Sequence, residues 1–152
     1  MFNPVEMEDG TIHHPYDIVM KMEKLGWILL KDNLKQEFFT SDHPVYVHNP
    51  PLGSKIIIRG YGLDSYTAES VEIFFPLTPR LCLVLFDKKY SEYKNWGLIR
   101  QVNQGELDWI NTQVIAMAHR TVFTKNNDFQ FVRECIKKHP KLKDPNRMRL
   151  SL

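Results

Sequence analysis

The residues best suited to chemistry form one run, Thr40-Ser41-Asp42-His43, which ends at Pro44. A carboxylate next to hydroxyls and an imidazole can act as a general base, or can bind a polar ligand or a metal ion. Apolar and aromatic residues flank the run within 37–49, and a β-type segment seldom gives up four successive positions to polar groups. The run is therefore the candidate site. The structural alternative is a turn in which these side chains bond nearby backbone amides.

Two functions are compatible with this run. The leading interpretation is a non-catalytic binding or assembly domain that is focused on Thr40–Pro44. The alternative is a hydrolase in which Asp42 acts with His43 or Arg120, so Asp42 and His43 are the candidate catalytic residues. Ser41 lacks the Gly-x-Ser-x-Gly turn of an activated serine. The candidate ligand-binding residues are Thr40, Ser41, Asp42, Asn111, Gln113 and Arg120.

The sequence predicts neither a metal site nor a cofactor. His43 and His48 have an odd spacing, so a regular strand would direct them to opposite faces. Neither has a nearby cysteine or a helical histidine partner four residues away. Gly60-Tyr61-Gly62 lacks the lysine and the third glycine of phosphate-binding loops.

Composition indicates an ordinary globular protein. With 152 residues, 43% of them hydrophobic, the chain can bury a core, and its net charge of +2 argues against nucleic acid as a partner. The longest apolar run, Leu81–Phe86, is far shorter than the roughly 20 residues of a membrane span. Cys82 and Cys135 show no Cys-x-x-Cys spacing, so we expect reduced core residues in a cytoplasmic protein.

Hydrophobic alternation predicts about seven strands around the candidate site. Two of them are short and meet at Asp42–Pro44, because Pro44 lacks a backbone donor. The Leu81–Phe86 strand is apolar on both faces, which is typical of a strand in mid-sheet. The other predicted strands are Trp27–Lys31, Lys55–Arg59, Val71–Phe75 before a turn at Pro76–Pro79, and Trp96–Val102.

Three helices are predicted from apolar residues recurring every three or four positions. They are Asp17–Leu25, Leu107–Phe123 and Phe129–Lys138, the second preceded by a capping box at Asn103 and Glu106. The expected fold is α+β, with a mainly antiparallel sheet and about three helices packed against it. We divide the chain into a flexible arm at 1–15, one α+β domain at 16–140, and a basic disordered tail at 141–152.

The long predicted helix carries three of the candidate residues. Asn111 lies at the edge of its apolar face, and a buried amide must find partners. We therefore expect Asn111 to tie the helix to strand-end backbone near the bend. Gln113 and Arg120 lie on another side, where Arg120 can reach a pocket near Asp42 or pair with its carboxylate.

Three motifs in order resemble those of a bacterial protein family of unknown function. They are Phe39–Val45, Phe75–Pro79, and Asn111-x-Gln113 followed by Ala116 or Ala118, Arg120 and Val122-Phe123. The resemblance covers roughly Trp27–Lys125 and implies no particular activity. Members of this family have a longer, mostly helical portion before the tryptophan-containing strand, so this chain resembles their C-terminal half.

That difference predicts a protein partner. The helix Asp17–Leu25 offers only a few inward side chains, which cannot cover both faces of a sheet that contains Leu81–Phe86. An apolar face left open usually marks an interface. We therefore expect a homodimer or a complex with a helical protein, with the open sheet face or the first helix at the contact, and we expect no membrane contact.

Overall fold

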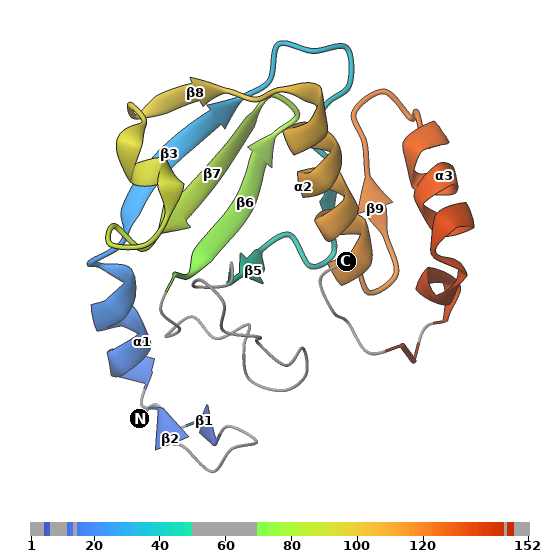
Figure 1. Cartoon of the computed structure of the whole chain (residues 1–152). Coiled ribbons are helices and arrows are strands. Elements are labelled where there is room, and N and C mark those ends of the chain that lie inside the picture. The colour runs from blue at the N-terminus through green and yellow to red at the C-terminus, as the bar shows by residue number, and fades with distance from the viewer. Residues whose placement is uncertain (1–4, 7–11, 14, 50–69, 145, 148–152) are drawn as a thin grey trace. The chain divides into compact units, whose positions relative to one another are not determined.

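The computed structural model describes residues 5–6, 12–13, 15–49, 70–144 and 146–147. In chain order (Figure 1) the elements are β1 (Val5–Glu6), β2 (Ile12–His13), α1 (Pro15–Met22), β3 (Gly26–Lys31), β4 (Thr40–Ser41), β5 (Tyr46–His48), β6 (Glu72–Thr78), β7 (Leu81–Phe86), η1 (Glu92–Asn95), β8 (Ile99–Gln101), α2 (Gln104–Met117), β9 (Val122–Phe123), α3 (Gln130–Lys138) and η2 (Pro140–Lys143), where η marks a 3₁₀-helix. The predicted strand Lys55–Arg59 lies outside the described residues.

The strands form one five-stranded sheet and two two-stranded sheets. The five-stranded sheet has the order β5-β6-β7-β3-β8, and β1-β2 and β4-β9 form the small ones. The large sheet is mostly antiparallel. It is mixed because β3 and β8 pair in parallel, with Leu29 opposite Ile99. The predicted α+β class, its mainly antiparallel sheet and its three helices are confirmed.

The chain divides into two compact units, which we describe separately. Unit 1 consists of Met1–Ile28, Val47–Phe74 and Val84–Leu98. Unit 2 consists of Leu29–Tyr46, Phe75–Leu83 and Ile99–Leu152. Strands β3, β5, β6 and β7 each contribute residues to both units.

In unit 1, aromatic side chains pack around η1. The ring of Tyr93 lies 6.3 Å from that of Phe74 and 5.9 Å from that of Phe86, measured between centroids. Gly26 opens β3 beside Phe86, and a Cβ at this position would lie 2.6 Å from the Phe86 ring. A glycine is therefore required where the strand passes this ring.

The core of unit 2 combines α2 with the strand ends. Helix α2 begins at Gln104, three residues before the predicted Leu107, and the predicted cap is Asn103, whose side chain accepts a hydrogen bond from the Glu106 amide at 2.9 Å. The carboxylate of Glu106 pairs with Arg100. Buried apolar residues from α2 and from the strand ends form this core: Leu30, Cys82, Val102, Leu107, Ile110 and Val114.

The opposite face of the unit 2 strands is open. Leu29 lies opposite Ile99 of β8. The Asp32 amide donates to the Arg80 carbonyl, so Asp32 faces Arg80 across β3 and β7. In an antiparallel pair with this register, Leu29 faces Leu83. These side chains alternate with buried neighbours along each strand. We call their surface the open sheet face, and it consists of Leu29, Phe75, Leu77, Leu81, Leu83 and Ile99, with exposed fractions of 37% at Phe75, 46% at Leu77 and 63% at Ile99.

Several predicted boundaries are wrong. The second helix ends at Met117 instead of Phe123, and α1 spans Pro15–Met22 instead of Asp17–Leu25. Strand β6 continues through Pro76 to Thr78, where a turn was predicted. Pro76 fits there because the neighbouring strand β5 has only three residues and cannot pair along the full length of β6.

None of the helices among the described residues is long and apolar enough to cross a membrane.

Candidate functional site

The polar run forms a bend between two short strands, as predicted. Strand β4 ends at Ser41 and β5 begins at Tyr46. The Ser41 hydroxyl donates to the carbonyl of His43 at 2.9 Å and accepts from its amide at 3.1 Å. Ser41 is buried, so its hydroxyl holds the bend closed from within.

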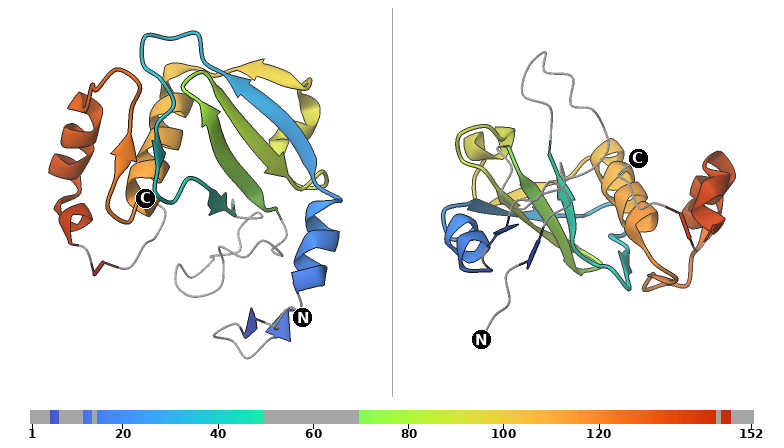
Figure 2. Two further views of the ribbon diagram at one scale, coloured as in Figure 1. Left: turned by 180° about the vertical axis from the view of Figure 1, so that it is seen from behind. Right: turned by 90° about the horizontal axis from the view of Figure 1, so that it is seen from below.

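The bend is joined to a distant segment of unit 2 through β9. Thr40 pairs with Phe123 and Ser41 with Val122 in an antiparallel ribbon, β4–β9. The Asp42 amide extends this pairing by donating to the carbonyl of Thr121 at 3.1 Å. On its other side β4 lies against α2, seen from behind in Figure 2.

The carboxylate of Asp42 binds the backbone that follows α2. One oxygen, Oδ1, accepts from the amide of His119 at 2.9 Å, and Oδ2 accepts from that of Arg120 at 2.8 Å. Partial loss of hydration would raise the pKa of Asp42, but the amides of His119, Arg120 and Thr121 and the nearby His119 side chain outweigh it and hold this pKa below its ordinary value. The carboxylate therefore stays ionised as an acceptor.

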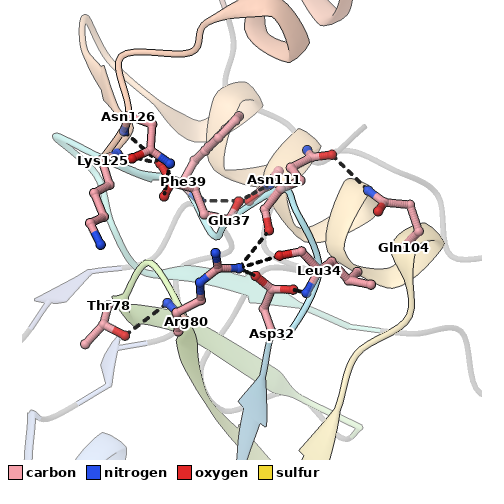
Figure 3. Close-up of polar contacts among 11 residues, drawn as sticks. Asp32, Leu34, Glu37, Phe39, Thr78, Arg80, Gln104, Asn111, Lys125 and Asn126 are labelled. Carbon is pink, nitrogen blue, oxygen red and sulfur yellow. Dashed lines mark hydrogen bonds and ion pairs between the residues drawn. The ribbon is translucent and has the colours of Figure 1, made fainter.

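A second carboxylate, Glu37, acts in the same way at the other end of the ribbon. Its Oε1 accepts from the amide of Lys125 at 2.5 Å and from that of Asn126 at 3.3 Å (Figure 3). Only 5% of Glu37 is exposed. Sequence reasoning missed this role, although a glutamate directly before Phe38-Phe39 is a detectable signal, because a buried carboxylate requires partners.

Asn111 connects α2 to the segment before the bend. Its side chain accepts from the Phe39 amide at 2.9 Å and donates to the carbonyl of Glu37 at 2.8 Å (Figure 3). The residue is fully buried. The predicted tie between the helix and strand-end backbone is confirmed, and it lies a few residues before Asp42.

The end of α2 is held from outside the helix. In a continuing helix, the amides of His119 and Arg120 would bond to the carbonyls of Ile115 and Ala116. Here Asp42 takes both amides, and Arg147 donates to the carbonyls of Ala116 at 3.0 Å and Ala118 at 2.7 Å. A residue of the predicted tail therefore caps the helix.

A further polar cluster, also missed from the sequence, fixes the loop after β3. The guanidinium of Arg80 pairs with buried Asp32 and donates to the carbonyls of Leu34 at 2.7 Å and Gln36 at 3.3 Å (Figure 3). One arginine thus holds three points of one loop. Its charge neutralises the buried carboxylate of Asp32, which is a structural role.

The structure brings only part of the candidate set together. Arg120 contributes its backbone amide to Asp42, and no ion pair between their side chains is found among the described residues. Gln113 is buried on α2. His43 meets His119, with ring centroids 5.9 Å apart, and both residues are exposed. No group of three or more His, Cys, Asp or Glu placed to hold a metal occurs in the described part of the chain.

Both cysteines are free and buried, as predicted. Burial raises the pKa of the Cys82 thiol well above its ordinary value, and it raises the pKa of Cys135 as well. Both shifts disfavour the thiolate, which is the nucleophilic form, at neutral pH.

Searches of curated proteins and of solved structures gave no match to this chain. A family model matches 126 of the 152 residues, which include the whole region Trp27–Lys125 that resembles a family of unknown function. The chain belongs to the family described as "Protein of unknown function (DUF4238)", whose model matches residues 3–128.

Proposed function

We propose that this chain is a non-catalytic binding or assembly domain of the cytoplasm. The Thr40–Pro44 bend fixes the β4–β9 ribbon, and an apolar surface makes the contact with a partner. The observation that carries the proposal is the open sheet face of unit 2. The two buried free thiols support a reducing compartment.

The bonding of the bend favours binding over catalysis. Both oxygens of Asp42 already accept backbone amides, and its lowered pKa makes it a weaker base than an ordinary carboxylate. A hydrolase that used Asp42 with His43 or Arg120 would need this carboxylate for a proton or an attacking water. In the observed geometry the carboxylate accepts two backbone amides, and its lowered pKa makes it poorly suited to take the proton.

Burial divides the candidate ligand-binding residues into two groups. Ser41, Asn111 and Gln113 are buried in unit 2 and support the bend from beneath. Asp42 and Arg120 are exposed and Thr40 is half-buried. A ligand at the bend would therefore contact only these last three, and we propose them as its binding residues.

The proposed occupant of the open sheet face is a second copy of the chain. Among the described residues of these strand ends, Lys31 is the only charged side chain on the same side as Leu29, so the face suits an apolar partner surface. Two identical sheets can stack about 10 Å apart with their side chains interdigitated. In a dimer with a two-fold axis, the same face of each chain contacts its counterpart. Each leucine or isoleucine that becomes well buried in the contact stabilises the dimer by roughly 1.5–3 kcal/mol.

Sedimentation velocity over a range from about 1 to 100 µM tests this contact, because a homodimer dissociates on dilution. We expect the wild type to sediment as a dimer, and Leu77→Lys and Ile99→Lys as monomers. Phe123→Lys is the matched control, because Phe123 is 52% exposed but lies on the separate β4–β9 ribbon. A wild type that remains monomeric throughout, or dissociation caused by the control alone, would reject the second copy. A monomer that forms a complex only with an added helical protein would point to that partner instead.

A further inference from the structure

The bend brings together two histidines that the sequence does not associate. The rings of His43 and His119 lie 5.9 Å apart at an interplanar angle of 46°. Their backbones are held by the bend, since the His43 amide donates to Ser41 Oγ and the His119 amide to Asp42 Oδ1. Both residues are exposed, so the rings can rotate while their backbones stay in place.

The separation is close to that of two imidazoles on one metal ion. With a metal–nitrogen distance of about 2.1 Å and the nitrogen about 1.2 Å from the ring centre, the centroids lie about 5.4 Å apart at a tetrahedral angle. The observed 5.9 Å exceeds this value by roughly half an ångström. Because both side chains are exposed, rotation about their side-chain bonds can bring the rings to the smaller separation.

The charges nearby favour a cation over an anion. Asp42 directly precedes His43, and its carboxylate uses one acceptor position on each oxygen for an amide, one of them that of His119. A carboxylate has about four such positions, so it can still accept from metal-bound water. The positive charge of Arg120 disfavours a bound cation. However, it is the Arg120 amide that bonds to Asp42, and the exposed side chain can extend into solvent.

We propose that His43 and His119 form a two-imidazole site for a transition-metal dication such as Zn²⁺ or Ni²⁺. Imidazole suits these ions, whereas Mg²⁺ and Ca²⁺ require oxygen ligands. Water completes the coordination, because the described residues offer no third protein ligand in place. The site is therefore weaker and more exchangeable than a structural zinc site with four protein ligands.

Calorimetric titration of the full chain with Zn²⁺ and with Ni²⁺ tests the site. We expect one ion per chain, and a loss of affinity of about tenfold or more in His43→Ala and in His119→Ala, since each removes one of two ligands. His48→Ala and His139→Ala are matched controls that keep full affinity. Unchanged binding in both His43→Ala and His119→Ala, or binding lost only in a His13→Ala/His14→Ala double variant, overturns the proposal.

Thermal unfolding gives a second readout that does not depend on heat of binding. His43 follows β4 and His119 precedes β9, so an ion that bridges them binds only the folded ribbon. Micromolar Ni²⁺ should raise the Tm of the wild type but not that of His43→Ala, and Mg²⁺ should leave both unchanged. A wild-type Tm that does not rise with Ni²⁺, or that rises equally in His43→Ala, contradicts the site.

Discussion

Asn111 illustrates how much a single buried amide contributes in unit 2. It satisfies one backbone donor, at Phe39, and one acceptor, at Glu37, and nothing else in the described structure replaces it. Asn111→Ala leaves both groups buried and unpaired and should lower the free energy of unfolding by about 2–4 kcal/mol. Asn111→Asp should be at least as damaging at neutral pH, because a carboxylate cannot donate to the Glu37 carbonyl. Urea unfolding measures both, and an alanine variant within about 0.5 kcal/mol of wild type would contradict the role.

Cys82 should make stability depend on alkaline pH. Its folded pKa is raised by burial, whereas the unfolded thiol ionises near pH 8.5–9. Above that pH only the unfolded chain loses the proton, so the contribution is present below about pH 8.5 and falls by about 1.4 kcal/mol per further pH unit. Urea unfolding at pH 8 and pH 10 should show a larger loss for wild type than for Cys82→Ala. Equal losses in the two proteins would show that the thiol does not resist ionisation in the fold.

Residue types alone indicated some of these roles and concealed others. The amide of Asn111 pointed to a structural tie, because a polar group at the edge of an apolar helix face has few alternatives. The carboxylates of Glu37 and Asp32 were missed, because their partners are backbone amides and an arginine far along the chain. Backbone amides have no sequence signature, so these contacts are visible only after folding.

At the level of elements, the end of α2 shows the same limitation. The apolar spacing continues through Ala118, Thr121 and Val122, and it predicted a helix to Phe123. The helix ends at Met117 because Asp42 binds the next amides and Arg147 binds the last carbonyls. The start of α2 was predictable because its cap, Asn103, is local.

Asp42 should therefore matter more for the shape of this connection than for chemistry. Asp42→Asn keeps one acceptor oxygen and places an amide donor against a backbone amide, and Asp42→Ala removes both acceptors. We expect the urea midpoint to decrease in the order wild type, Asn, Ala. Asp128→Asn is the matched control, because Asp128 takes a single amide from its close neighbour Gln130. A control as damaging as Asp42→Asn would mean that the long-range bonds contribute no more than a local turn.

Gly26 places a steric limit on β3. A methyl group there would lie 2.6 Å from the Phe86 ring, which also packs against Tyr93 and cannot move freely. Gly26→Ala should destabilise by roughly 1–3 kcal/mol, in the range of overpacked cores. Gly97→Ala has no atom within 4 Å of the new methyl group and should change stability by less than about 0.5 kcal/mol. Thermal unfolding of the two variants side by side checks this, and equal effects would contradict the steric explanation.

For the whole molecule, the C-terminal segment is more than a charged tail. Arg147 donates to two carbonyls at the end of α2, a contact that no apolar periodicity could predict. Arg147→Ala should lower the free energy of unfolding by about 1 kcal/mol, the usual size for partly exposed hydrogen bonds. Arg133→Ala, on the exposed side of α3, should have almost no effect. Deleting 141–152 should cost at least as much as Arg147→Ala, and an unchanged Tm would show that the cap is dispensable.

The fold class was predictable because it depends on periodicity, which the chain displays in β3, β7, α2 and α3. The two-stranded ribbon was not, since β4 and β9 have two residues each and no pattern of their own. The candidate site followed the same rule. Its local turn at Ser41 and His43 was predicted, and its long-range partners were not.

The distance in sequence between β4 and β9 also has a consequence for biosynthesis. Asp42 and its partner His119 are 77 positions apart, and at 5–20 residues per second a ribosome needs about 4–15 s to add that many. During that interval Phe39, almost fully buried in the finished protein, lacks Phe131, whose ring centroid lies 5.9 Å from its own. Nascent chains stalled between the bend and α2 should therefore be the forms that chaperones bind and that aggregate. The last third of the chain must therefore be made before the aromatic side chains near the bend can be buried.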